Sequence, residues 1–166
     1  SESLISAETF RIKLLWALEG KEAQNEEPKP RKTLILANPF GGAGAAARNW
    51  EIAKPLFDVA HIDYTLKWTE RANHAHDIVH EELQAGQYDV IVTVSGDGLI
   101  HEVVNGLCTR ADWDTFKETI TIGCVPGGTA NGLVKSILHR MGEFYHVEEA
   151  AFVVIKGERI GMDLTE

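Results

Sequence analysis

The sequence predicts an α/β fold, a Rossmann-like parallel sheet with helices on both faces. The first supporting observation is an apolar, mostly β-branched run at residues 90–94. It shows no alternation of polar and apolar positions, which is typical of a strand buried on both faces of a parallel sheet. The second is an order that repeats: an apolar run, a glycine-rich turn and a helical pattern follow one another at residues 33–57, 90–107 and 120–140. Turns that follow parallel strands lie at one edge of the sheet, so these three turns are expected to converge.

The individual elements follow from periodicity and from the positions of glycine, proline and capping residues. Leu99, Val103 and Leu107, for example, fall on one face of a helix. On this basis strands are expected at residues 33–37, 61–68, 90–94 and 120–125, and helices at residues 45–57, 73–86, 99–107 and 133–140.

The remaining segments are less regular. Residues 110–118 are interpreted as a loop or a short helix. Residues 147–156 favour a helix that Gly157 ends, although the apolar run 152–155 would also suit a strand. A final strand is expected at residues 159–164.

Three parts are expected along the chain. Residues 1–20 contain an amphipathic helical pattern, interpreted as the end of an upstream module, and residues 21–32 form a polar linker with Pro28 and Pro30. Residues 33–166 form the domain proper. The chain begins with Ser and ends on an expected strand, so we expect it to be a piece of a longer protein.

Composition narrows the class of protein. The 166 residues, 44% apolar and 25% charged, are ordinary for one globular domain with an appendage. A formal charge of -9 argues against a nucleic-acid partner. The two cysteines lack metal-ligand spacing, which favours a reduced intracellular protein. No apolar stretch is long enough to span a membrane, so we expect a soluble chain, with peripheral membrane contact left open.

The central turn places an acid between two glycines. Asp97 follows the strand at residues 90–94, and Gly96 and Gly98 permit backbone angles that other residues avoid. N–H groups at the start of the next helix favour an anion such as phosphate. Asp97 would then accept the proton of an attacking alcohol, while Glu102 would hold magnesium directly or through water. The alternative is that Asp97 is simply the N-cap of that helix.

The first glycine-rich turn, residues 38–44, has the composition of a phosphate cradle. It is not a Walker A loop, because no Lys-Ser/Thr pair follows. Gly42, Gly44 and Ala47 match the loose dinucleotide pattern. A Rossmann-type NAD-binding oxidoreductase, with Glu70 on a ribose, is therefore an alternative, and a plain tight turn is another.

Polar residues that follow the second expected strand are candidates for ligand or metal binding. Thr69 occupies the position of a hydroxyl that faces a ligand. His74, His76 and His80 resemble metal ligands in composition, but they lack a suitable third ligand nearby and are better interpreted as a solvated helix face.

Several motifs occur together and in order. They are Asn-Pro-Phe-Gly-Gly at residues 38–42, Thr-Glu-Arg-Ala-Asn-His-Ala at 69–75, Ser-Gly-Asp-Gly at 95–98, His-Glu-Val-Val-Asn-Gly-Leu at 101–107 and Pro-Gly-Gly-Thr-Ala-Asn-Gly at 126–132. Together they resemble the catalytic domain of lipid kinases of the diacylglycerol kinase group. Ser95 before Gly-Asp-Gly is most similar to the sphingosine kinase branch, because diacylglycerol and ceramide kinases more usually carry Gly-Gly-Asp-Gly.

The resemblance implies a function and an architecture. It implies transfer of phosphate from ATP, with Mg²⁺, to a sphingoid base, giving sphingosine 1-phosphate; diacylglycerol or ceramide is the alternative acceptor. It also implies a two-domain lipid kinase, in which a second, β-rich domain outside this chain supplies the lipid pocket. The full-length protein is then expected to be cytoplasmic with peripheral membrane association. This chain alone is expected to bind nucleotide weakly, to phosphorylate sphingosine negligibly and to self-associate, and an inactive regulatory fragment is a third interpretation.

The resemblance also assigns residues. It implies Asp97 as the catalytic base and places Glu102, the candidate magnesium residue, at a nucleotide-site position. The family's first loop commonly has lysine where this chain has Ala43, and its third loop commonly has glycine where this chain has Ala130. Both departures bear on nucleotide affinity. The positions that the resemblance assigns to the nucleotide site are Asn38, Gly41, Gly42, Thr69, Ser95, Gly96, Gly98, Glu102, Gly128 and Thr129.

Overall fold

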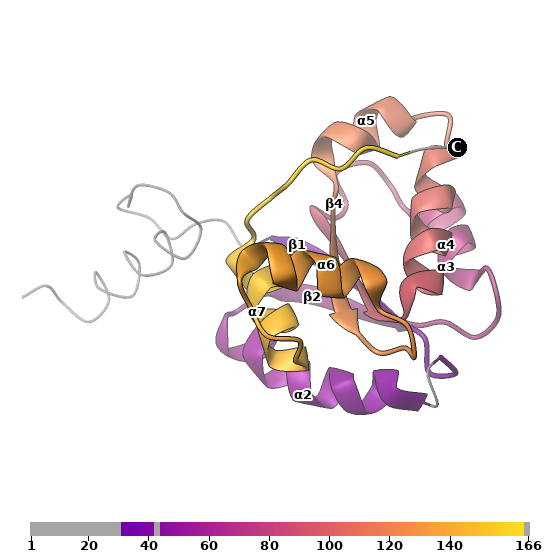
Figure 1. Cartoon of the computed structure of the whole chain (residues 1–166). Helices are drawn as coiled ribbons and strands as arrows, with labels where there is room; N and C mark the ends of the chain where they lie inside the picture. The colour runs from indigo at the N-terminus through magenta and orange to yellow at the C-terminus, as the bar shows by residue number, and fades with distance from the viewer. Residues whose placement is uncertain (1–30, 42–43, 165–166) are drawn as a thin grey trace, which may run out of the picture.

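A single parallel sheet forms the centre of the protein (Figure 1). The computed structural model of the chain describes residues 31–41 and 44–164. The helix expected within residues 1–20 and most of the linker expected at residues 21–32 therefore lie outside the described residues. The sheet has the order β2-β1-β3-β4 and all of its pairings are parallel. This confirms the predicted fold class. The strands are β1 (Lys32–Ala37), β2 (Asp63–Trp68), β3 (Val90–Ser95) and β4 (Thr121–Pro126).

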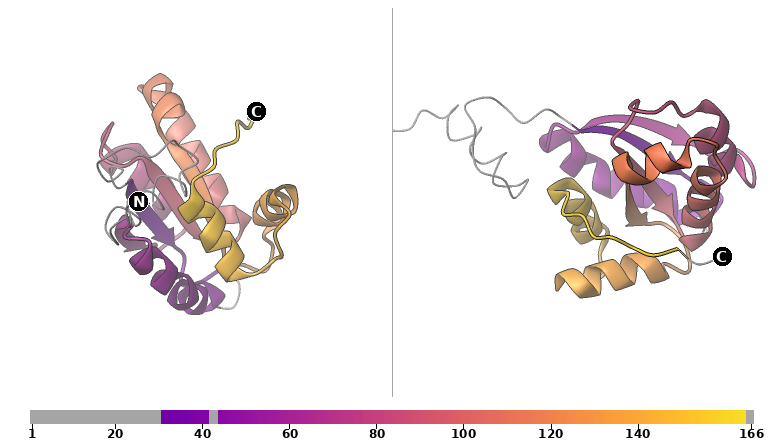
Figure 2. Two further views of the ribbon diagram at one scale, coloured as in Figure 1. Left: turned by 90° about the vertical axis from the view of Figure 1, so that its left-hand side faces the viewer. Right: turned by 90° about the horizontal axis from the view of Figure 1, so that it is seen from above.

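Helices cover both faces of the sheet, as the two views of Figure 2 show. On one face lie α2 (Ala45–Val59) and α7 (Val147–Lys156), which share a core with β1 and β3. On the other lie α3 (His74–Asp77), the π-helical turn η2 (Ile78–Glu82), α4 (Asp97–Cys108) and α5 (Trp113–Thr119). Helix α6 (Gly132–Met141) packs beside β4 through a smaller cluster.

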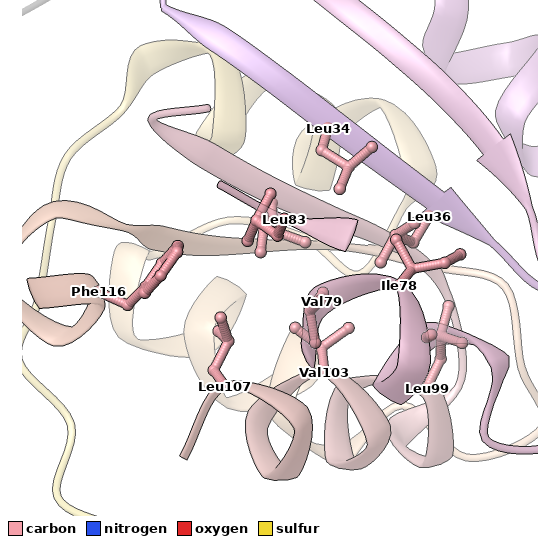
Figure 3. Close-up of a cluster of buried hydrophobic side chains, with 11 residues drawn as sticks. Leu34, Leu36, Ile78, Val79, Leu83, Leu99, Val103, Leu107 and Phe116 are labelled. Atoms are coloured by element: carbon pink, nitrogen blue, oxygen red, sulfur yellow. The ribbon is translucent and has the colours of Figure 1, made fainter. Parts of the chain in front are cut away.

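Strand β3 contributes side chains to the hydrophobic cores on both faces of the sheet. All six of its residues are buried. Ile91 packs with Leu34 and Leu36 in the cluster drawn in Figure 3, whereas Val92 and Val94 belong to the cluster on the opposite face. Because successive side chains of a strand point to opposite faces, an unbroken apolar run is what a central strand requires.

The helix expected at residues 73–86 is shorter and less regular than predicted. It consists of α3 and then η2, and the chain becomes extended at Leu83, which is 4% exposed in the core. The guanidinium of Arg110 donates to the carbonyl oxygens of Val79 and His80, both at 2.7 Å. This contact satisfies carbonyls at the end of the helix, so the helix ends where Leu83 enters the core.

The C-terminal region resolves one alternative and corrects one expectation. Residues 147–156 are the helix α7, which ends at Gly157 with a φ of 73°. The strand expected at residues 159–164 is wrong, because this segment is irregular and exposed. It runs from α7 towards α5 (Figure 1) and borders an apolar cavity of about 400 Å³ beside β4. A strand needs a hydrogen-bonding neighbour, and among the described residues this segment has no strand partner. Residues 113–119 form the short helix α5, with Phe116 buried.

Two glycines of α4 give a stability prediction. A Cβ at Gly106 would lie 2.7 Å from the carbonyl oxygen of His76, whereas a Cβ at Gly98 would have nothing within 4 Å. We expect Gly106→Ala to lower the free energy of unfolding by about 1–3 kcal/mol, because two helix backbones must separate. Gly98→Ala, the control in the same helix, should be neutral or stabilising by up to about 1 kcal/mol. Urea unfolding measures both, and equal midpoints for the two variants would contradict the close helix contact.

Candidate functional site

The three glycine-rich turns meet at the carboxyl edge of the sheet. The backbone N–H of Asn38, after β1, donates to the carbonyl of Val94 at 3.3 Å. After β4, the N–H of Gly127 donates to the carbonyl of Ser95 at 2.9 Å. The register pairs Ser95 with Pro126, so β3 and β4 end side by side. The predicted convergence of the turns is therefore confirmed.

Two of the turns pack backbone against backbone. A Cβ at Gly128 would lie 2.5 Å from the amide nitrogen of Gly96, and a Cβ at Gly96 would lie 2.8 Å from the carbonyl oxygen of Ala130. Gly96 has φ -84° and ψ -177°, which any residue adopts. The expectation that Gly96 supplies an unusual backbone angle is therefore wrong. Gly96 and Gly128 are glycines because a side chain at either position would force the two turns apart.

Asp97 links the same two turns through its side chain. It is the first residue of α4, after the N-cap position at Gly96, so it is not the N-cap of its own helix. Its carboxylate instead accepts hydrogen bonds from the backbone N–H of Gly132 at 2.7 Å and of Leu133 at 3.1 Å. These are the first two residues of α6, where N–H groups lack partners within the helix. Asp97 therefore caps a helix that is distant in the sequence.

Asn131 organises the third turn from within. It is 4% exposed, and its Oδ1 accepts from the N–H groups of Gly127 at 3.3 Å and Gly128 at 3.2 Å. Its Nδ2 donates to the carbonyl of Gly128 at 2.7 Å. Asn131 was not among the functional residues expected from the sequence, although an asparagine directly before a helix in a glycine-rich turn was a usable signal. The N–H of Gly128 thus has a partner within the protein.

Glu102 has a structural partner as well. Its Oε2 accepts from the N–H of Ala75 at 3.2 Å, in the first turn of α3. Among the described residues there is no group of three or more histidine, cysteine, aspartate or glutamate side chains suited to a metal ion. Magnesium in nucleotide sites is usually held by one or two carboxylates together with phosphate oxygens, and a single glutamate fits that pattern.

The three histidines do not form the solvated face that we expected. All are half-buried, and the rings of His76 and His80 stack with centroids 5.4 Å apart. A ring nitrogen of His80 lies 3.2 Å from the carbonyl oxygen of Gly106. His74 accepts from the N–H of Glu70 at 3.0 Å. These contacts fasten α3 and η2 to α4 and to the end of β2.

Other assigned residues shape the turns. The Oδ1 of Asn38 accepts from the N–H of Phe40 at 2.9 Å. The hydroxyl of Ser95 donates to the carbonyl of Gly96 at 2.8 Å. Thr69 is 2% exposed and its hydroxyl lies 3.5 Å from the carbonyl of Ala37, so it is buried rather than turned to a ligand. Gly41 and Thr129 lie in the first and third turns, while Gly42 and Ala43 lie outside the described residues.

Gly98 differs from the other glycines of the site. It is exposed in the first turn of α4, and nothing lies within 4 Å of where its Cβ would be. Glycine in a helix is less favourable than alanine by about 1 kcal/mol, and here no contact within the described chain requires it. The open space beside the N–H groups of a helix start is suited to an oxyanion.

Nucleophilic catalysis by cysteine does not fit this edge. Burial raises the pKa of the Cys124 thiol to about 11. The thiol therefore stays protonated near neutral pH, and a thiol is a far weaker nucleophile than a thiolate.

The carboxylate of Asp97 has two oxygens, each of which accepts one N–H and retains a second lone pair. An acceptor of protons, rather than a covalent nucleophile, is the chemistry that this arrangement supports.

The glycine-rich turns, the acid between them and the parallel sheet define a class of protein. The model of the protein family described as "Diacylglycerol kinase catalytic domain" matches residues 32–166, and the chain belongs to that family. The match favours the kinase interpretation over the NAD-binding alternative. Within the described residues, no helix has the length and apolar character needed to cross a membrane.

Among individual relatives, sphingosine kinases are similar to this chain. Sphingosine kinase 1 of Arabidopsis thaliana is 40% identical over 137 residues, which cover 82% of this chain and 28% of the relative. Human Sphingosine kinase 1 is 43% identical over 116 residues, covering 69% of this chain and 30% of the relative. The chain thus spans less than a third of the length of these relatives. The structure of a diacylglycerol kinase from Bacillus anthracis has a TM-score of 0.62 at 26% identity, covering 80% of this chain and 42% of that one.

The cap on α6 can be tested directly. We expect Asp97→Ala to lower the free energy of unfolding by about 0.5–2 kcal/mol, as loss of a helix cap does. Amide hydrogen exchange at Gly132 and Leu133 should become faster, because both amides lose their acceptor. Asp97→Asn retains one acceptor oxygen and should show a smaller effect on both measurements. Unchanged exchange at both amides in Asp97→Ala would show that the carboxylate does not cap α6.

Proposed function

We propose that this domain binds MgATP and carries the catalytic base of a kinase that phosphorylates the primary hydroxyl of a sphingoid base. The product would be sphingosine 1-phosphate. The observation that carries the proposal is the placement of Asp97 where the turns after β3 and β4 meet, with its carboxylate oriented by Gly132 and Leu133. The sequence similarity to sphingosine kinases supports the choice of acceptor.

The nucleotide phosphates would lie along the carboxyl edge. Gly98 leaves open space at the start of α4, and Gly41 and Thr129 belong to the turns on either side. A phosphate there gains from the partial positive charge of a helix N-terminus. Glu102, on the same helix, is the proposed magnesium residue, directly or through water. When bound, Mg²⁺ would supply positive charge to the phosphate oxygens.

The proposed role of Asp97 is general-base catalysis. The acceptor hydroxyl oxygen forms a bond to the γ-phosphorus, the bond from that phosphorus to the β–γ bridging oxygen breaks, and ADP leaves. The hydroxyl proton passes to a carboxylate oxygen of Asp97. Because two backbone N–H groups already fix the carboxylate, it needs little rearrangement to receive the proton.

The acceptor pocket is proposed to lie mainly in a second, β-rich domain of the same protein. The resemblance supports this, as does the greater length of the sphingosine kinases, of which the chain spans 28–30%. We further propose that the full-length protein is cytoplasmic and associates peripherally with membranes, where its lipid substrate resides. Diacylglycerol or ceramide is the alternative acceptor.

Replacement of Asp97 tests the proposal. In the complete enzyme, Asp97→Asn should lower sphingosine phosphorylation by about 10²-fold or more, because the amide cannot accept the proton. The affinity for MgATP should change little. Asp114→Asn, an exposed carboxylate on α5, is the matched control and should leave turnover unchanged. Near-normal turnover of Asp97→Asn would leave Asp97 with only its structural role.

A further inference from the structure

Helix α4, which begins at the carboxyl edge, carries two acidic residues, and a polyphosphate bound at that edge would need nearby positive charge. The chain carries a formal charge of -9, and Asp97 and Glu102 both lie on α4. The first Lys or Arg residues after β1, β2 and β4 are Arg48, Arg71 and Lys135, respectively. Arg71 is 2.6 Å from the carboxylate of Asp77 and is already paired. Arg48 and Lys135 have no ion pair within the described part of the chain.

Lys135 is the one of these two whose side chain has a defined support. It is in the first turn of α6, three residues after Gly132, and its Nζ lies 5.1 Å from the centroid of the Tyr145 ring. Such cation–π contacts attract an ammonium group to the face of an aromatic ring. Helical side chains tend to lean towards the helix N-terminus, and α6 begins directly after the third turn. The ammonium group of Lys135 is therefore held against the Tyr145 ring, on the first turn of the helix that follows the third glycine-rich turn.

Tyr145 supplies the aromatic ring of this contact. It comes from the connection between α6 and α7 and is 42% exposed. The pKa of Tyr145 is raised above its ordinary value, chiefly by partial burial; the charge of Asp97 adds to this shift and the side chain of Asn131 opposes it. The Tyr145 side chain therefore lies near Asn131 and Asp97, and its ring faces the ammonium group of Lys135.

We propose that Lys135, positioned by the ring of Tyr145, binds the phosphate chain of the nucleotide. This inference rests on the proposed binding of MgATP and extends it by naming the protein cation at the third turn. An ammonium donor to a phosphate oxygen forms a charge-assisted hydrogen bond, which is stronger than a neutral one. Tyr145 is a positioning residue in this scheme, because it acts through Lys135.

Calorimetric titration of this chain with MgATP tests the inference. Lys135→Met retains the aliphatic chain but removes the charge, and we expect it to raise the Kd for MgATP about tenfold. Lys135→Arg should bind MgATP within about threefold of the unaltered chain, because the charge remains. Tyr145→Leu should raise the Kd by a smaller factor, since the ammonium group loses its support. Lys54→Met, which removes an exposed lysine paired with Asp58 on α2, is the control and should leave the Kd unchanged.

The outcomes separate this inference from the proposed function. The urea midpoint of Lys135→Met without nucleotide should equal that of the unaltered chain, which excludes a folding defect as the cause of weaker binding. Lys135→Met binding as tightly as the unaltered chain would overturn the inference and leave the proposed function standing. Binding of MgATP by Lys135→Arg as weak as by Lys135→Met would likewise overturn the inference and leave the proposed function standing. Failure of the unaltered chain to bind MgATP would overturn the proposed function and this inference together.

Discussion

The geometry of the candidate site depends on the contact between the Asp97 carboxylate and the start of α6, which consists of two hydrogen bonds. It joins the turn after β3 to the turn after β4 across 35 residues of sequence, with oxygen–nitrogen distances of 2.7 and 3.1 Å. In the same two turns, the backbones of Gly96 and Gly128 pack too closely for a side chain at either position. Together the two contacts fix the third turn relative to the acid. The position of Asn131 and of α6 follows from them.

Helix α4 fastens its neighbours through two acidic side chains. Asp97 caps α6, and Glu102 accepts from the N–H of Ala75 at the start of α3. Carboxylates stabilise helix N-termini both by accepting hydrogen bonds and through the helix dipole. The same two residues are those to which we assign catalysis and magnesium binding. Structural and chemical roles therefore coincide on one helix, so stability and turnover must be measured on the same variants to separate them.

The sequence predicted those features that depend on local patterns. The buried run of β3, the order of strand, turn and helix, and the convergence of the turns all follow from periodicity and from the glycines. The link from Asp97 to α6 could not be assigned, because it depends on which backbone groups meet after folding; the contacts of Asn131 with Gly127 and Gly128 are local, and its place before a helix was a usable signal. The π-helical turn was missed for a similar reason, since it ends where Arg110 binds carbonyls thirty residues away. Residues 159–164 have a strand-like pattern, but pattern alone cannot supply the neighbouring strand that they lack among the described residues.

The central claim is that the three turns form one nucleotide site, and backbone NMR of the ¹⁵N-labelled chain titrated with MgATP tests it most directly. We expect the largest amide shift changes at Gly41, Gly98 and Thr129, one in each turn, with a common binding curve. Magnesium with NAD in place of ATP should leave these amides nearly unchanged. Shift changes confined to the apolar cavity beside β4, or larger changes with NAD than with ATP, would contradict the account.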